Sequence, residues 1–357
     1  MKLIHCSDLH LDSRMEANLS SEQAKERNHE ILLTFQRMVQ YAKQNDVDIV
    51  MIAGDLFDSN RISSSTVDYF FNAIRNAKDI DFLYLKGNHD ESKRTKKQEN
   101  LPDNLKLFHD EWMYYHYDFL TIAGIEINQE NANSLYPALS LDPNQTNIVM
   151  LHGQETTQPG VDMVCLPQLK NKNIDYLALG HIHSYKKEVL DERGSYAYCG
   201  CLEGRGFDEC GEKGFILLDV NPQHIETTFV PFARRQLHDV EVDITGKETN
   251  PEIKAAMEEA SAHIKQEDLV KFTLVGEYTL DTRRDFERLK KDFQDRFYFC
   301  KIKDNSHLKI EKENYEHDIS LKGEFIRKVM ASTLSDEEKE EIIVAGIQAL
   351  SGKEITQ

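Results

Sequence analysis

Five short apolar segments, each ending in a cluster of polar residues, constrain the fold of this 357-residue chain more than any other feature. Runs of this length, rich in Val, Ile, Leu and Tyr and ending near glycine, are typical of buried β-strands. Segments with helical periodicity separate the first three runs, so the pattern predicts a layered α/β fold. The five segments are KLIHCSD (2–8), DIVMIAGD (48–55), DFLYLKGNHD (81–90), NIVMLHG (147–153) and DYLALGHIH (175–183).

Two amphipathic helices are predicted between the first three strands. Residues 21–44 place apolar side chains at the helical period, and Ser20 and Gln23 have the spacing of an N-terminal capping box. The second helix follows the second strand and carries Val67, Phe70, Phe71 and Ile74. The stretch between the fourth and fifth strands is poorly periodic.

The pattern changes near residue 236, where we expect a domain boundary. Residues 237–304 alternate strand, helix, strand, helix, strand, with the helices at 251–264 and 282–295, which predicts a small second α/β unit. Two more helices are expected from Leu321 onward. The first carries an apolar stripe that begins at Leu321. The second begins at Ser335, with Glu338 in the capping-box position, and ends at Gly352. The predicted domains are therefore 1–235, 236–318 and 319–357.

The charge of the chain bears on its partners. With 43 Lys and Arg against 62 Asp and Glu, the formal net charge is −19. A protein that holds nucleic acid by phosphate neutralisation alone is usually basic. A nucleic-acid-binding function would therefore need positive charge from bound metal ions, a local basic patch or a partner.

The sequence also bears on the cellular compartment. No segment resembles a signal peptide, and no apolar run approaches the roughly 20 residues that cross a bilayer. A cytoplasmic protein that makes no membrane contact is therefore expected. The six cysteines lack paired C-x-x-C spacing. Cys199 and Cys201 are expected to be buried reduced thiols, with a metal site as the alternative.

The polar clusters that end the five strands contain side chains that bind metal ions. In layered α/β sheets the strand ends face a common crevice, so residues distant in sequence converge there. Carboxylate, imidazole and amide groups without thiolates suit Mn²⁺, Fe²⁺ or Zn²⁺. The candidate ligands are Asp8, His10, Asp55, Asn88, His152, His181 and His183.

This set is too large for one ion, and sharing Asp55 would give each of two ions four protein ligands. Two ions roughly 3.5–4 Å apart suit in-line attack at phosphorus. Any one cluster alone is more typical of a polar loop. Five clusters in order, each after an apolar strand, favour a two-metal centre.

The ordered motifs D-x-H, GD-x-x-D, GNHD, H and GHIH resemble the calcineurin-like metallophosphoesterase superfamily over residues 1–235. Within it, SDLHLDS, GDLFD and YCGCLEGRGFDECGEKGFILLDV (198–220) are most similar to the SbcD and Mre11 DNA-repair nucleases. This resemblance implies a layered β-sandwich flanked by helices, a small α/β capping domain that helps to position DNA, and C-terminal helices.

The resemblance also implies a role for each site residue. Asp8, His10, Asp55 and His183 would bind one ion, and Asp55, Asn88, His152 and His181 the other. His89 matches the histidine that contacts the scissile phosphate and would protonate the leaving oxygen. Asp90 would orient His89 by accepting its other ring proton. Asp58 is expected to support a ligand or the local structure.

A basic stretch, SKRTKKQ (92–98), follows the third cluster directly in an otherwise acidic chain. This stretch is explained equally well as a solvated loop or as a segment that binds the DNA backbone. Arg205 lies in a stretch that resembles one near the family's active site, and a turn with structural glycines explains it almost as well. The candidate DNA contacts are Lys93, Arg94, Lys96, Lys97 and Arg205.

The function implied is a DNA exonuclease or endonuclease that uses two divalent ions, with Mn²⁺ ahead of Fe²⁺, Zn²⁺ and Mg²⁺. It would be the nuclease subunit of an SbcCD-like or Mre11–Rad50-like complex. Helices 321–351 would dock on the ATPase partner, with packing on the protein's own surface as the alternative, and a homodimer is expected by resemblance. A phosphodiesterase for small nucleotides and a non-catalytic scaffold are the other classes. The complete ligand set argues against the scaffold.

Overall fold

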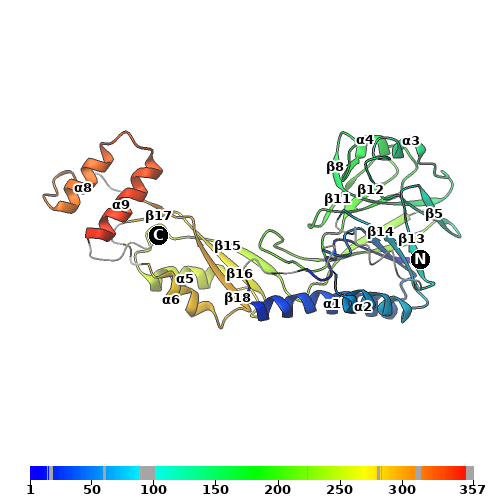
Figure 1. Cartoon of the computed structure of the whole chain (residues 1–357), viewed down its shortest axis with the longest axis horizontal. Helices are drawn as coiled ribbons and strands as arrows, with labels where there is room; N and C mark the ends of the chain where they lie inside the picture. The colour runs from blue at the N-terminus through cyan, green and yellow to red at the C-terminus, as the bar shows by residue number, and fades with distance from the viewer. Residues whose placement is uncertain are drawn as a thin grey trace. The chain divides into compact units, whose positions relative to one another are not determined.

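The computed structural model describes residues 1–13, 15, 19–58, 62–88, 90, 101–222, 224–279, 282, 284–309 and 315–350. The chain divides into two compact units, Met1–Leu237 and His238–Gln357 (Figure 1). Each unit has apolar cores of its own. In the described part of the chain, no helix has the length and apolar character needed to cross a membrane.

The first sheet of the first unit has six strands in the order β14-β13-β1-β2-β3-β4. Strands β1 to β4 run parallel, whereas β13 pairs antiparallel with β1 and with β14. The three strands predicted nearest the N-terminus are confirmed, and each ends just before its polar cluster. The strands are β1 (Lys2–Cys6), β2 (Ile49–Ala53), β3 (Asp81–Leu85), β4 (Leu105–Leu107), β13 (Gly214–Asn221) and β14 (His224–Pro231).

The second sheet also has six strands, in the order β11-β12-β10-β7-β6-β5. Its strands are β5 (Met113–Tyr117), β6 (Leu120–Gly124), β7 (Thr146–His152), β10 (Tyr176–Gly180), β11 (Lys186–Val189) and β12 (Ser195–Tyr198). Strands β7 and β10, which are parallel neighbours, confirm the fourth and fifth predictions. The other four lie where no strand was predicted. A small pair, β8 (Gln154–Thr156) and β9 (Met163–Cys165), lies between β7 and β10 in the chain.

The two sheets pack face to face with helices on both outer faces (Figure 1). The core between the sheets joins Met51 and Leu83 of the first to Ile122 and Ile148 of the second. On the outer face of the second sheet lie two short helices, α3 (Leu135–Ala138) and α4 (Leu166–Leu169). The predicted β-sandwich flanked by helices is therefore confirmed.

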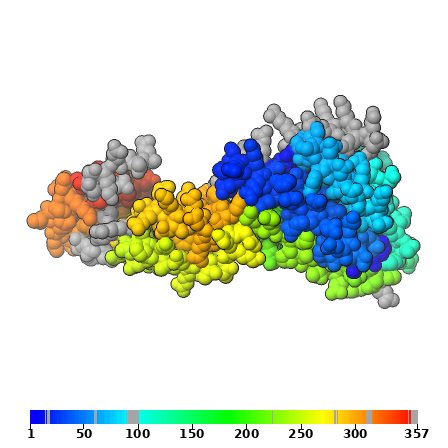
Figure 2. All heavy atoms as spheres, turned by 90° about the horizontal axis from the view of Figure 1, so that it is seen from below, coloured from blue at the N-terminus to red at the C-terminus, as the bar shows by residue number. Residues whose placement is uncertain are grey.

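Two longer helices, α1 (Ser21–Gln44) and α2 (Ser64–Arg75), cover the outer face of the first sheet. Figure 2 looks onto this face, with α1 in dark blue and α2 in lighter blue. Phe35 and Phe70 point inward and join the core beneath them. Helix α1 has the predicted bounds, and the capping box between Ser20 and Gln23 is present.

The second unit contains a sheet of β15 (Leu237–Asp243), β16 (Leu269–Val275) and β18 (Phe299–Asp304). Its helices are α5 (Asn250–Ala260), α6 (Phe286–Phe293), α8 (Leu321–Met330) and α9 (Asp336–Leu350), and a short pair joins β17 (Glu277–Tyr278) to β19 (His307–Leu308). Helix α6 begins later than predicted because Asp285 is its N-cap and accepts the backbone N–H of Arg288.

The two C-terminal helices confirm the predicted pair. Ser335 and Glu338 form the predicted capping box. Ile326 of α8 and Ile343 of α9 are buried in one small core. Leu321, predicted to belong to the apolar stripe of α8, is 68% exposed. The predicted end of the last helix at Gly352 lies outside the described residues.

Candidate metal centre

The polar clusters gather at one edge of each sheet, where parallel strands end together. Strands β1, β2 and β3 end at one edge of the first sheet, and β7 and β10 end at one edge of the second. Six of the seven predicted ligands lie there in two groups, and the ligand atoms within each group lie within 4.8 Å of one another. The groups are Asp8, His10 and His183, and Asp55, His152 and His181.

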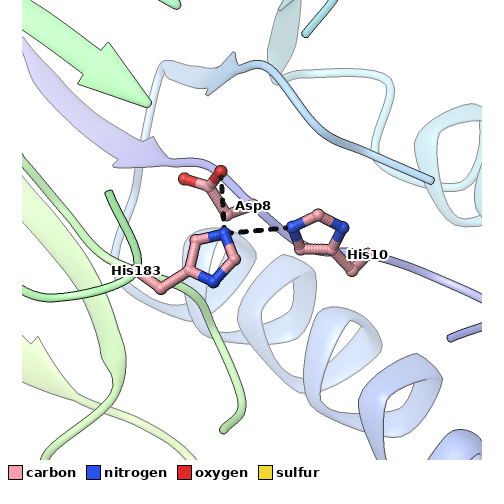
Figure 3. Close-up of side chains that lie close together, drawn as sticks. All are labelled: Asp8, His10 and His183. Atoms are coloured by element: carbon pink, nitrogen blue, oxygen red, sulfur yellow. Dashed lines mark hydrogen bonds and ion pairs between the residues drawn. The ribbon is translucent and has the colours of Figure 1, made fainter. Parts of the chain in front are cut away.

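The first group converges on a single point (Figure 3). The Nε2 atom of His183 lies 3.2 Å from Nε2 of His10 and 3.6 Å from Oδ1 of Asp8. The side chains of Asp8 and His10 are almost fully buried, whereas that of His183 is partly exposed. Two imidazole nitrogens and a carboxylate oxygen thus face one another.

The outer nitrogens of these two rings both face carboxylates. Nδ1 of His10 lies 3.1 Å from Oδ1 of Asp58, and Nδ1 of His183 lies 2.7 Å from Oε1 of Glu209. A ring that donates its proton from Nδ1 keeps a lone pair on Nε2. Two such lone pairs 3.2 Å apart repel each other unless a cation lies between or beside them. The first group therefore fits a divalent ion.

The second group is joined to the first through Asp55. Its Oδ2 atom lies 3.5 Å from Nε2 of His152 and 3.9 Å from Nε2 of His10. The seventh predicted ligand, Asn88, approaches the same His152 nitrogen with Oδ1 at 3.1 Å. Nδ1 of His152 donates to the carbonyl of Ala53 at 2.9 Å, which again leaves Nε2 for a metal. Asp55 thus lies between the two groups, as a bridging ligand must.

The backbone of this site is strained at the ligands themselves. Asp8, His10, Asp55 and His181 have positive φ angles of 51°, 43°, 50° and 104°. Such conformations are uncommon for residues other than glycine and cluster at functional sites. The N–H of Asp8 donates to the carbonyl of Gly54, and that of His10 to the carbonyl of Asp55, both at 3.0 Å. These bonds hold the loops after β1 and β2 together.

The electrostatics of the site favour cations. Burial lowers the pKa of His152, but Asp55 and Asp8 raise it more, and the balance is a pKa of about 9. Burial lowers the pKa of His181, and the neighbouring His152 lowers it further. The carboxylates therefore attract positive charge, and a proton on His152 competes with a metal ion for the same nitrogen.

Glu209 and Arg205 complete the surroundings of the first group. Arg205 donates from Nη2 to Oε1 of Glu209 at 2.7 Å and from Nη1 to Oδ1 of Asp58 at 2.8 Å. Burial raises the pKa of Glu209, yet His183 and Arg205 hold it well below its usual range, so this carboxyl is ionised. Glu209 was not predicted, because nothing in its spacing sets it apart within 198–220.

Asp90 has a well-defined place, whereas its predicted partner lies outside the described residues. Its buried carboxylate accepts the backbone N–H of Gly87 at 3.0 Å, of Leu56 at 3.1 Å and of Phe57 at 2.9 Å. It thereby ties the loop after β2 to the turn after β3, and its contact with His89 stays a prediction. The predicted residues that lie outside the described part are His89, Lys93, Arg94, Lys96 and Lys97.

Cys199 and Cys201 are free and buried, and burial raises the pKa of both thiols well above the usual range. Neither thiol belongs to the ligand groups that the described residues form. Their burial matches the expectation of buried thiols.

Comparison with known proteins agrees with this geometry. The family model described as calcineurin-like phosphoesterase matches residues 1–185, which is just over half of the chain. The DNA double-strand break repair protein Mre11 of Sulfolobus acidocaldarius is 25% identical over 369 residues, covering 96% of this chain and 94% of that protein. The SbcD subunit of the SbcCD nuclease of Staphylococcus epidermidis is 26% identical over 292 residues, covering 68% of this chain and 72% of that protein.

A third relative is the uncharacterized metallophosphoesterase YhaO of Bacillus subtilis, 27% identical over 262 residues. The match covers 67% of this chain and only 61% of that longer protein. The residues matched by the family model include every member of the two ligand groups. The chain therefore belongs to the calcineurin-like phosphoesterase family of metal-dependent hydrolases, with relatives named Mre11 and SbcD.

Proposed function

We propose that this chain is a nuclease that hydrolyses phosphodiester bonds in DNA with the help of two divalent ions. The observation that carries the proposal is the position of Asp55, whose Oδ2 lies 3.9 Å from a ligand nitrogen of one group and 3.5 Å from one of the other. When bound, two ions sharing one carboxylate would activate water and neutralise charge that develops at phosphorus.

The chain's own residues would divide the work as follows. Asp8, His10 and His183 would hold one ion, Asn88, His152 and His181 would hold the other, and Asp55 would be shared. His89 would donate a proton to the leaving oxygen, and Asp90 would orient it. We propose Mn²⁺ as the ion, and the same oxygen and imidazole donors also fit Fe²⁺, Zn²⁺ or Mg²⁺.

The choice of DNA is supported by the relatives and not by the metal groups. The match to a protein named for double-strand break repair runs over 96% of this chain, so it includes the second unit. We propose that the α/β part of this unit helps to position DNA and that α8 and α9 dock on an SbcC-like or Rad50-like ATPase in the cytoplasm. Leu321 and Leu350 offer exposed apolar side chains for such docking. The partner would supply DNA affinity that a net charge of −19 does not.

The test is digestion of end-labelled linear DNA by the full chain in Mn²⁺, alongside hydrolysis of bis-p-nitrophenyl phosphate. Asp55→Asn removes the shared carboxylate with little change in size. Asp81→Asn is the matched control, because Asp81 begins β3 at the opposite end of the strand, paired with Lys106 and 29% exposed.

Three outcomes are distinct. Degradation of DNA by the native chain and by Asp81→Asn, but not by Asp55→Asn, supports the nuclease. Hydrolysis of the small ester with intact DNA would mean that the centre acts on smaller phosphodiesters or that cleavage of DNA requires the ATPase partner. If neither substrate is cleaved, the catalytic proposal is wrong.

A further inference from the structure

Three charged side chains form a bridge behind the first ligand group. We call Asp58, Arg205 and Glu209 the bridge. Its guanidinium lies between the two carboxylates, 2.8 Å from Asp58 and 2.7 Å from Glu209. Arg205 also donates its backbone N–H to Glu209 at 2.7 Å, which fixes the turn that carries both residues.

Each carboxylate of the bridge has a second contact, and that contact is a metal-ligand histidine. The Asp58 oxygen that accepts from Arg205 also lies 3.1 Å from Nδ1 of His10. The Glu209 oxygen that accepts from Arg205 lies 2.7 Å from Nδ1 of His183. One planar guanidinium therefore sets the separation of two carboxylates, and each carboxylate lies beside the outer nitrogen of one imidazole, where it favours a proton on Nδ1.

We propose that Arg205 is a positioning residue for one of the two metal ions, holding His10 and His183 with their Nε2 atoms turned to the ion. The second group is held in another way, since His152 donates to the carbonyl of Ala53 in strand β2. Loss of Arg205 should thus weaken the binding of one ion and leave the binding of the other unchanged. This inference rests on the two-metal centre of the proposed function, and it does not depend on the substrate.

The geometry favours this role over a direct contact between Arg205 and DNA. The Nε, Nη1 and Nη2 atoms of Arg205 all donate within the bridge, and the side chain is only 19% exposed. Without the guanidinium, two carboxylates would face each other across the space that it leaves. Their repulsion would push them apart, and a carboxylate that moves away no longer holds its imidazole in place.

The size of the effect follows from other metal sites. Loss of a group that orients a ligand typically weakens metal affinity by about 10- to 100-fold. Arg205→Ala removes both contacts at once, so the upper part of that range is expected for the first ion. Arg205→Lys keeps the charge but not the planar fork, so it should restore part of the affinity.

The experiment is equilibrium dialysis of the full chain against Mn²⁺, which counts bound ions and needs no substrate. The native chain should bind two ions. Arg205→Ala should bind one with native affinity and the other about 10- to 100-fold more weakly. Arg193→Ala is the matched control, because Arg193 makes a similar ion pair with Asp175 at 2.9 Å, is 30% exposed and lies near the start of β10, away from the ligands.

Each outcome decides something. Two ions of native affinity in Arg205→Ala would overturn the inference and leave the two-metal centre intact. An equal loss of affinity for both ions, with an unchanged circular dichroism spectrum, would also overturn the inference, because a general structural role of Arg205 has that effect. Fewer than two ions in the native chain would remove the two-metal centre itself, and the inference with it. If Arg205→Ala does not fold, Arg205→Lys decides by the same criteria.

Discussion

Replacing Gly87 with alanine would place a methyl carbon 2.2 Å from Oδ1 of Asp55 and 2.5 Å from the backbone nitrogen of Asp55. Ordinary contacts of a Cβ atom begin at 3.4 Å, so the carboxylate would have to move by about 1 Å. Rotation of the side chain cannot relieve the second clash, because its partner is a main-chain atom. The loop after β2 must therefore shift together with Asp55, the ligand that two ions would share.

Two consequences of Gly87→Ala can be measured separately. Crowding of this kind costs about 1–3 kcal/mol, so the urea midpoint should fall. Displacement of a reacting group by about 1 Å costs about 100-fold in rate, so hydrolysis of bis-p-nitrophenyl phosphate should fall by at least that factor. Dialysis of Gly87→Ala should show weaker binding of both Mn²⁺ ions, whereas Arg205→Ala should weaken the binding of only one.

The matched control for this change is Gly160→Ala. Its new methyl carbon meets first the sulfur of Met163 at 2.8 Å, at the end of a flexible and exposed side chain that can move away. Stability and hydrolysis should therefore stay near native. The reasoning is refuted if Gly87→Ala binds two ions with native affinity and hydrolyses the ester as fast as Gly160→Ala.

Three more measurements would test the site. A proton must leave His152, whose pKa is about 9, before its Nε2 can bind a metal ion. The affinity for Mn²⁺ should therefore rise by up to about tenfold per pH unit and level off above about pH 9. Titration calorimetry over that pH range would measure the change in affinity. Asp90→Asn should lower the free energy of unfolding by about 1–3 kcal/mol, measured in urea, because the amide that replaces one oxygen cannot accept a backbone N–H. Removal of metal with EDTA should lower the free energy of unfolding by about 2.7 kcal/mol per ion, compared with the chain in Mn²⁺ at 100 times the Kd. An unchanged urea midpoint would argue against metal binding.

Local signals explain what could be predicted from the sequence. Helix α1 was predicted with its bounds because Ser20 and Gln23 form a capping box within one turn of the chain. The strands β1, β2, β3, β7 and β10 were predicted because each is an apolar run that is buried throughout or nearly so. Their shared edge then predicted that the polar clusters would meet.

The parts that were not predicted depend on contacts between distant residues. Strand β5 (MYYHY) is only partly buried and shows no alternation, so its pairing with β6 decides its conformation. Glu209 resembles any other acidic residue until the fold brings it to His183, and Arg205 meets Asp58 across 147 positions of sequence. No pattern within a short window reports such pairs.

Each ligand group of the candidate metal centre takes residues from both sheets. The first ligand group takes Asp8 and His10 from the loop after β1 of the first sheet and His183 from the loop after β10 of the second. The second group takes Asp55 from the first sheet, and its histidines from the second. Each ion would therefore join both sheets, and neither group can form before the sandwich is closed. Because the unfolded chain lacks such a preformed site, metal binding and the packing of the two sheets must stabilise each other.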